Sequence, residues 1–199
     1  MQLKSITAII VLLLVVVSLS VAGCTSSNTN TSSQTNTSSQ TTKTTYTSAD
    51  RGYAITYPDN WGKDVNNSTA AIVDFVLTPS SNNINVVTVA SVKLNATTGT
   101  TLPGFTDSSL RDASSFYGYT LLSIENSTLA GQPATKTVWT ATAPQKIGGA
   151  TSNAQIKTMQ YLVVHNGRGY VIGYKTVQDD YNTYLTQAQD VINSFKFTS

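Results

Sequence analysis

Residues 156–177 read IKTMQYLVVHNGRGYVIGYKTV, and this stretch carries the clearest structural signal in the chain. Two runs rich in β-branched and aromatic residues, 156–165 and 169–177, lie on either side of Asn166-Gly167. Asn-Gly between two such runs is the strongest short-range signal for a β-hairpin, because both central positions of a type I′ turn need positive φ. The stretch therefore predicts two adjacent antiparallel strands.

Five further strands are predicted from runs that alternate in polarity or are rich in β-branched residues. They lie at 52–57, 71–78, 85–94, 119–125 and 134–143. Gly148–Asn153 precedes the 156–177 hairpin and is expected to be a polar loop, because it combines Gly, Ser, Thr and Asn.

Two helices are predicted from apolar residues that recur at helical spacing. The first is expected over 107–117, capped by one of its first two residues. The second is expected over 179–195, with Asp179 and Asp180 as its cap and as partners of the helix dipole. Strands that are sequential in pairs, together with two helices, predict an α+β fold with an antiparallel β-sheet.

The N-terminal residues predict where the protein is located. Lys4 precedes an apolar run over residues 6–17, and Leu-Ser-Val-Ala-Gly at 19–23 leads to the only cysteine, Cys24. A basic residue, an apolar core and small residues before a cysteine are typical of a lipoprotein signal peptide. Residues 1–23 are therefore predicted to be that signal. Cys24 is predicted to be the lipid attachment site, where acyl chains such as palmitate hold the chain on the extracytoplasmic face of the cell membrane.

Two alternatives stay open from these residues alone. An uncleaved helical anchor is compatible with residues 6–23, which approach the roughly 17 to 20 residues that span a bilayer. Ordinary secretory cleavage would release the same domain with one unpaired cysteine. All three interpretations place the mature chain outside the cytoplasm.

The rest of the chain divides into a tether and one domain. Residues 24–48 are nearly all Thr, Ser, Asn and Gln, so they are expected to form a disordered tether with almost nothing apolar to bury. Residues 49–199 are expected to form a single domain of ordinary length.

Composition excludes two classes of protein. Charged residues make up 11% of the chain and the net charge is +2, so no basic stripe is available to neutralise a row of phosphates. No nucleic acid partner is therefore expected. One cysteine cannot form an internal disulfide, so the domain must be held together by its core.

Several short segments resemble the PsbP-like superfamily. They are GYAITYPDNW at 52–61, the predicted helix near Phe116, AGQPA at 130–134, the hairpin that contains Tyr161, and VINSFKF at 191–197. The resemblance covers about residues 50–197 and implies an antiparallel sheet flanked by helices, an α/β/α sandwich. The signal and the polar tether resemble the prokaryotic and archaeal lipoprotein branch of that superfamily, whose members have no known activity.

The sequence contains no set of residues that is typical of a catalytic or metal site. His165 is the only histidine and stands beside the predicted hairpin turn, so it is interpreted as a strand-end residue at the surface. No Gly-x-Ser-x-Gly elbow accompanies it. Zinc needs three or four Cys, His or carboxylate ligands, and no such group is expected here. The protein is therefore predicted to have no catalytic residues, no metal and no cofactor.

Two sets of residues are candidates for recognition or modification. Aromatic side chains can line a sugar or peptide groove, and the first candidates for such a surface are Trp61, Tyr161 and Tyr174. Asparagines in Asn-x-Ser/Thr sequons are N-glycosylation acceptors if the host glycosylates them. These are Asn30, Asn36, Asn66, Asn67, Asn95 and Asn126.

These observations predict a membrane-tethered lipoprotein with a non-catalytic domain that binds or supports envelope proteins. The alternative is a lipoprotein that binds a small molecule, an ion or a glycan. Partners are thus expected to be the membrane, through the lipid anchor, and an envelope protein.

Overall fold

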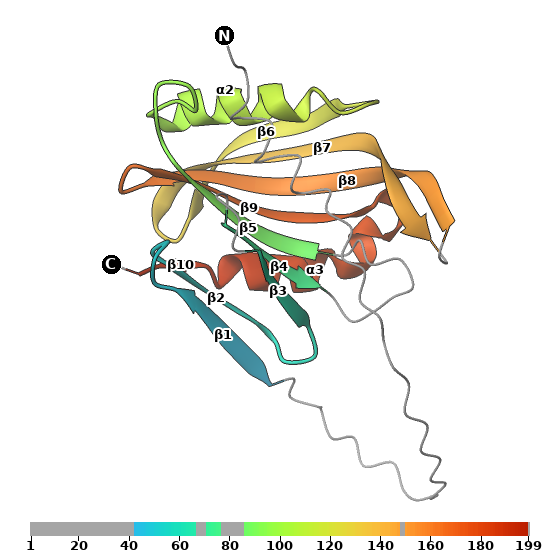
Figure 1. The fold of residues 1–199 in the computed structure, drawn as a ribbon, viewed down its shortest axis with the longest axis horizontal. Helices are drawn as coiled ribbons and strands as arrows, with labels where there is room; N and C mark the ends of the chain where they lie inside the picture. Colours follow the sequence, from blue (N-terminus) through green and yellow to red (C-terminus); the bar gives the residue numbers. More distant parts are fainter. Residues whose placement is uncertain (1–41, 67–70, 77–85, 148–149, 199) are drawn as a thin grey trace, which may run out of the picture.

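The computed structural model of the protein describes residues 42–66, 71–76, 86–147 and 150–198. These residues form two antiparallel sheets and two α-helices. Helix α2 (Leu102–Ala113) lies on one face of the larger sheet, and α3 (Tyr181–Asn193) lies on the other (Figure 1). The prediction of an α+β fold with an antiparallel sheet flanked by helices is confirmed.

The larger sheet has seven strands in the order β3-β4-β5-β9-β8-β7-β6. In that order the strands are β3 (Gly62–Asn66), β4 (Ala71–Val76), β5 (Val86–Lys93), β9 (Arg168–Val177), β8 (Ala150–His165), β7 (Gln132–Ile147) and β6 (Thr120–Leu129). The smaller sheet consists of β1 (Lys43–Ser48), β2 (Tyr53–Pro58) and β10 (Lys196–Phe197), with β2 in the middle. The chain crosses from β5 to the far edge strand β6 through α2, so α2 is drawn across one face of the sheet.

The Asn166-Gly167 hairpin forms as predicted. β8 and β9 pair antiparallel up to His165 opposite Arg168, and the two residues between them have φ of 47° and 69°. Both values lie in the left-handed region that Asn and Gly tolerate best. This hairpin lies in the middle of the larger sheet, between β5 and β7.

Helix α3 packs between the two sheets. Its apolar stripe, Ala188, Val191 and Ile192, is buried together with Phe195, which follows the helix. The same cluster contains side chains from both sheets, namely Tyr53, Ile55 and Tyr57 of β2, Val87 and Val89 of β5, Met159 and Val163 of β8, and Tyr170, Ile172 and Tyr174 of β9. One helix face therefore joins the small sheet to the large one.

Helix α2 covers β7 and β8 on the opposite face. Phe105 and Ala113 are its buried apolar residues. Phe105 lies so close to Gly169 of β9 that a Cβ built on this glycine would be 2.6 Å from the phenyl ring. Glycine at this position thus allows the helix to approach the sheet.

The tether prediction was wrong for its last residues, because Lys43–Ser48 form β1. This strand pairs along its whole length with β2, with Tyr46 opposite Ile55. Threonine is β-branched and suits an edge strand, and the neighbouring strand supplies the hydrogen bonds that the segment cannot make alone. Tyr46 adds a contact with Tyr53, at 6.2 Å between ring centroids. Residues 24–41 lie outside the described part of the chain.

The predicted boundaries of both helices also needed correction. The first helix begins at Leu102, because Thr101 caps it by accepting a hydrogen bond from the Gly104 backbone N–H at 3.4 Å. It ends at Ala113, before the predicted end at 117. The second helix begins at Tyr181 after a short 3₁₀ turn over Gln178–Asp180, and the Asp180 side chain makes no capping hydrogen bond. The cap predicted at Asp180 was wrong, because the 3₁₀ turn leads the chain into the helix.

Two strand predictions were incomplete. β7 extends to Ile147 and β8 begins at Ala150. Most of the loop predicted at Gly148–Asn153 is therefore strand. Polar residues at the end of a ribbon gave no strand signal in the sequence. The edge strand β3, which has five residues and pairs with β4, was not predicted either.

The hydroxyl of Ser194 fixes the end of α3 to β2. Its Oγ accepts a hydrogen bond from the Thr56 backbone N–H at 2.8 Å, and it lies 2.9 Å from the Thr56 carbonyl oxygen and 2.6 Å from that of Val191. Because the hydroxyl carries one proton, these two carbonyls share it. The contact joins elements that are 138 residues apart in sequence.

Replacing this hydroxyl tests its contribution to stability. Ser194→Ala is expected to lower the free energy of unfolding by about 1–3 kcal/mol, because it leaves the partly buried Thr56 N–H without its partner. Urea denaturation followed by tryptophan fluorescence measures the change. Ser114→Ala is the matched control, since that exposed hydroxyl contacts only the Arg111 carbonyl of its own helix. Equal effects of the two substitutions would contradict the role assigned to Ser194.

Candidate functional site

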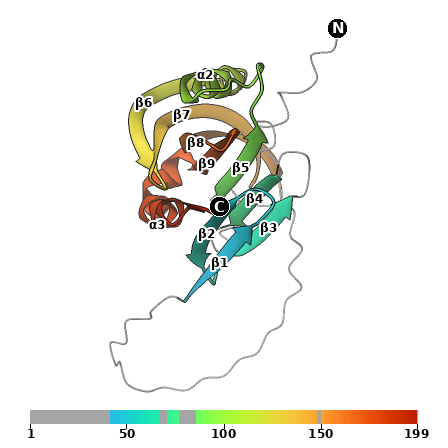
Figure 2. The ribbon, with the colours of Figure 1, turned by 90° about the vertical axis from the view of Figure 1, so that its left-hand side faces the viewer.

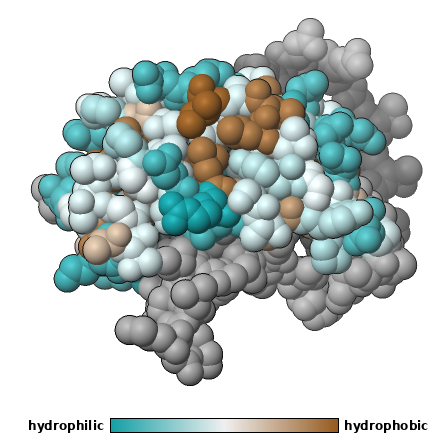
Figure 3. Space-filling model, turned by 90° about the horizontal axis from the view of Figure 1, so that it is seen from above, coloured by the Kyte–Doolittle hydropathy of each residue, from teal (hydrophilic) through white to brown (hydrophobic). Residues whose placement is uncertain are grey.

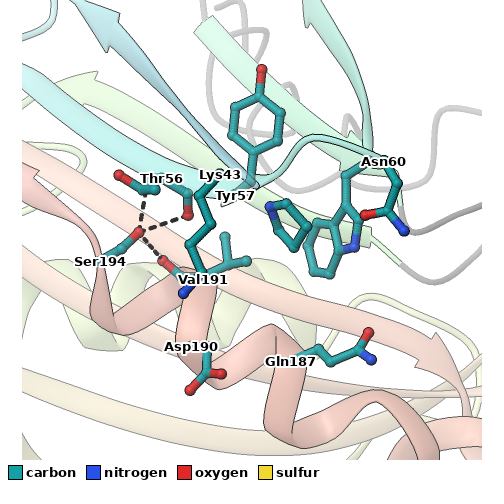
Figure 4. A pocket seen from close by; sticks show the side chains of 10 residues that line it. Lys43, Thr56, Tyr57, Asn60, Gln187, Asp190, Val191 and Ser194 are labelled. Carbon is teal, nitrogen blue, oxygen red and sulfur yellow. Dashed lines mark hydrogen bonds between the residues drawn. The ribbon is translucent and has the colours of Figure 1, made fainter. Parts of the chain in front are cut away.

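A cleft of about 210 Å³ lies between the β1–β2 hairpin and the second half of α3. Its polar lining includes Lys43, Asn60, Gln187 and Asp190, and its apolar lining includes Tyr57, Pro58, Trp61 and Val191. Figure 4 shows the Lys43 side chain extending from β1 towards α3, where Asp190 and Gln187 stand on the helix. The cleft is smaller than the roughly 300–1,000 Å³ of typical pockets for drug-sized ligands, so it suits a small molecule.

Local hydrogen bonds set the position of each wall of the cleft. The turn after β2 is closed by the Trp61 N–H, which donates to the Pro58 carbonyl at 2.9 Å. The Asp59 N–H donates to the Thr42 carbonyl at 3.0 Å, and this bond ties the same turn to the start of β1. The α3 wall is held by Ser194, which also lines the cleft.

The Asp59 carboxylate strengthens the same turn from outside the cleft. Hydrogen bonds from Thr42 and Thr44 hold the pKa of this exposed carboxyl below its usual value. The charged form is therefore the one that joins β1 to the turn. Because β1 begins at Lys43, this contact helps to keep the lysine at the mouth of the cleft.

The cleft contains one cation and one anion that are not neutralised. Among the residues that the structure describes, neither Lys43 nor Asp190 forms an ion pair, with the other or with a third residue. Both are exposed. Trp61, by contrast, is only 5% exposed, so the cleft combines a charged mouth with an apolar wall.

The structure separates the three aromatic residues that the sequence suggested for a recognition surface. Trp61 lines the cleft. Tyr161 is half-buried and packs against the main core. Tyr174 was a wrong prediction, because its ring is fully buried under α3 and its hydroxyl donates to the Tyr181 carbonyl at 3.2 Å. These three side chains do not form one surface.

Sequence reasoning missed the polar residues of the cleft. Lys43 is the only charged residue in the stretch from 25 to 48, and this isolation was the one available signal. Asp190 and Gln187 belong to the polar side of an amphipathic helix, where such residues are expected at every exposed position. Nothing in the sequence distinguishes them from other solvated residues.

A second surface is formed by exposed apolar residues at the β6 edge. Tyr117, Leu121, Leu122 and Ile124, here called the β6 apolar surface, are the large hydrophobic residues exposed among those that the structure describes. Figure 3 shows hydrophobic residues gathered on the face of the molecule that carries α2. Patches of this kind on soluble domains often mark sites of interaction.

The arrangement of β6 explains why this surface is exposed. Leu121 and Ile124 lie opposite Trp139 and Thr137 of β7, on the sheet face that carries α2. Helix α2 packs mainly on β7 and β8 and leaves much of β6 uncovered. A bulge between Leu121 and Ser123 adds Leu122 to the edge. β6 pairs only with β7, so its outer backbone groups have no partner strand among the described residues.

His165 ends β8 beside the hairpin turn, as predicted. Its ring stacks on Phe197, at 4.0 Å between ring centroids. In the described part of the chain, no group of three or more His, Cys, Asp or Glu is placed to hold a metal ion. The helices within that part are too short or too polar to span a bilayer.

The predicted modification sites are only partly covered by the structure. Cys24, Asn30, Asn36 and Asn67 lie outside the described residues, and Asn66 is the last residue of β3. Asn95 and Asn126 are exposed. The Asn95 side-chain oxygen accepts hydrogen bonds from the backbone N–H groups of the two threonines that follow it, at 2.8 and 3.0 Å.

Comparisons with known proteins agree on the fold. A profile of PsbP-like proteins matches residues 4–197. The structure is similar to the cyanobacterial PsbP protein CyanoP of Synechocystis sp. PCC 6803, with 15% identity and a TM-score of 0.57, over 83% of this chain and 98% of that one. It is also similar to LpqN of Mycobacterium tuberculosis, which is involved in cell envelope biogenesis, with 14% identity and a TM-score of 0.52, over 79% and 91% of the two chains. No curated protein sequence matches.

Buried tyrosines near α3 predict a loss of stability at alkaline pH. Burial raises the pKa of Tyr181 to about 12 and also raises the pKa values of Tyr53 and Tyr174. In the unfolded chain tyrosine ionises near pH 10, so unfolding releases protons above that pH. The contribution of these tyrosines to the free energy of unfolding is therefore expected to be constant below about pH 10 and to fall from there towards pH 12.

Urea denaturation at a series of pH values measures this fall. Tyr181→Phe is expected to make it smaller, because one group with a raised pKa is removed. Tyr117→Phe serves as the control, since the Tyr117 side chain is 82% exposed. A fall of unchanged size in the Tyr181→Phe protein would contradict the prediction.

Proposed function

The chain belongs to the PsbP-like family, and we propose that it is a lipid-anchored protein on the extracytoplasmic face of the cell membrane whose non-catalytic domain binds another envelope protein. The apolar run and the small residues before Cys24 support the lipid anchor. Two acyl chains on one cysteine would provide the two hydrophobic signals that stable anchoring needs. The similar protein LpqN is involved in cell envelope biogenesis, which is consistent with an envelope role here.

The observation that carries the proposal is the β6 apolar surface beside an open strand edge. An exposed edge can accept an extended segment of another protein as an additional strand, with backbone hydrogen bonds for affinity and apolar contacts for specificity. Leu122 and Ile124 are 52% and 51% exposed and could supply those contacts. β6 contains no lysine or proline, two residues that commonly protect an edge from pairing; its one charged residue is Glu125, and its bulge lies at one end, between Leu121 and Ser123.

This edge also lies apart from the point where the tether joins the domain. The chain from Cys24 enters the described domain at β1, and both ribbon views place β1 towards the bottom of the molecule and β6 towards the top (Figures 1 and 2). An anchor that joins the domain at β1 would leave the β6 edge free for a partner. We infer that the partner contributes an extended apolar segment.

The lipid anchor is tested first. Intact mass of the protein purified from its native membrane is expected to show a chain that begins at Cys24 and carries a diacyl group. Cys24→Ala is expected to remove the modification and to prevent processing at that site. A mass that begins at Met1 in the native protein would indicate an uncleaved helix, and an unmodified chain that begins near Cys24 would indicate a secreted domain. Either result would overturn the lipid anchor.

Partner binding is tested at the β6 apolar surface. The double substitution Leu122→Glu and Ile124→Glu is expected to abolish cross-linking of the protein to its partner in native membranes, because it places charge within the apolar contact. Quantitative mass spectrometry of the cross-linked complexes measures the loss. Thr47→Glu is the control, because it adds one such charge at an exposed position of an edge strand of the smaller sheet, β1. Unchanged cross-links in the double variant, with thermal unfolding like that of the native protein, would contradict the proposal.

A further inference from the structure

The β6 apolar surface does not account for the cleft between the β1–β2 hairpin and α3. The two charged residues of the cleft come from separate elements, Lys43 from β1 and Asp190 from α3. β1 pairs with β2 along its whole length, and two contacts between Ser194, after α3, and Thr56 of β2, at 2.8 and 2.9 Å, join that hairpin to the helix. The positions of the lysine and the aspartate are therefore set by the fold.

Opposite charges on one cleft commonly form an ion pair, and here they do not. In the described part of the chain Lys43 and Asp190 form no ion pair, although both line the same cleft. An exposed surface pair contributes little to stability, so its absence costs the fold little. A ligand that carries both an anion and a cation could satisfy the two residues at once, each through a charge-assisted hydrogen bond.

The apolar wall indicates what the rest of the ligand is. Trp61 and Val191 are almost fully buried, and they line the cleft. Figure 4 shows Asn60 and Gln187 on the side of the cleft away from Lys43. A compact apolar group could lie against the indole, while the two amides border the opening. A volume of about 210 Å³ restricts the ligand to a small molecule.

We propose that this cleft binds a small zwitterionic molecule, a free α-amino acid with an apolar side chain. Its carboxylate contacts the Lys43 ammonium, its ammonium contacts the Asp190 carboxylate, and its side chain packs on Trp61. Asn60 and Gln187 limit the length of that side chain. This inference concerns a different surface from β6 and does not depend on the partner proposed there.

Calorimetric titration of the full-length protein in detergent, with L-leucine as the probe, tests the proposal. The native protein is expected to bind L-leucine about tenfold more tightly than leucine amide, which lacks the carboxylate, and than N-acetyl-leucine, which lacks the ammonium. Binding should also change the fluorescence of Trp61, and a Trp61→Phe variant should lose this change. Trp139, the other tryptophan, is buried between α2 and the sheet.

Two substitutions assign the charges. Lys43→Met is expected to weaken binding of L-leucine about tenfold and to leave leucine amide unaffected, because the amide has no carboxylate to lose a partner. Asp190→Asn is expected to weaken the binding of L-leucine about tenfold as well. It should leave the binding of N-acetyl-leucine unaffected, because that derivative has no ammonium to lose a partner. Lys196→Met and Asp179→Asn are the controls, since neither residue lines the cleft.

Three results would overturn the proposal. The first is no binding of L-leucine, L-valine or L-phenylalanine to the native protein at millimolar concentration. The second is equal affinity for L-leucine and its two blocked derivatives, which would mean that the cleft does not recognise the carboxylate and the ammonium of the ligand. The third is equal weakening of all three probes by each substitution, which would indicate a general disturbance of the cleft. Cross-linking through β6 would be unaffected in every case, so the two proposals fail separately.

Discussion

The burial of one helix against two sheets is the constraint on which the rest of this structure depends. Ala188, Val191 and Ile192 must be removed from water, and neither sheet alone covers them. β2 closes over α3 from one side and β5, β8 and β9 from the other. The short strand β10 follows directly and adds Phe197 to the small sheet. The cleft lies where this enclosure ends, because its walls are the β1–β2 hairpin and the polar side of the same helix.

The opposite face of the sheet follows a different arrangement, and this difference exposes β6. One helix of twelve residues crosses that face, and it packs on β7 and β8. Phe105 reaches the sheet at Gly169, while Trp139 is covered by residues at the end of the helix and after it. The last strand in the order therefore keeps an uncovered side, together with its unpaired edge. Closure of the core around α3 and incomplete closure around α2 give the molecule two chemically different surfaces, one charged and concave, the other apolar.

Sequence reasoning succeeded where the signal was local and failed where a partner element decided the outcome. The Asn166-Gly167 turn imposes its own geometry, so its hairpin could be predicted from a few residues. Lys43–Ser48 show no core-forming pattern, and they become a strand only because β2 offers them an edge. Tyrosine is a residue type that is common at recognition surfaces, but α3 covers Tyr174. The sequence pattern predicts that the Asp180 side chain caps α3. The 3₁₀ turn before the helix instead leads the chain into it, and the Asp180 side chain makes no capping hydrogen bond.

The class of fold, the central hairpin, the presence of two helices and the family could all be predicted from the sequence. These depend on periodicity, turn chemistry and short motifs, all of which act over neighbouring residues. The tertiary structure alone decided that Lys43 and Asp190 line one cleft, and that Leu122 and Ile124 remain exposed on an open edge. Such relations join residues that are distant along the chain. They are set by the packing of α3 and α2 on the sheets, and no local pattern in the sequence records that packing.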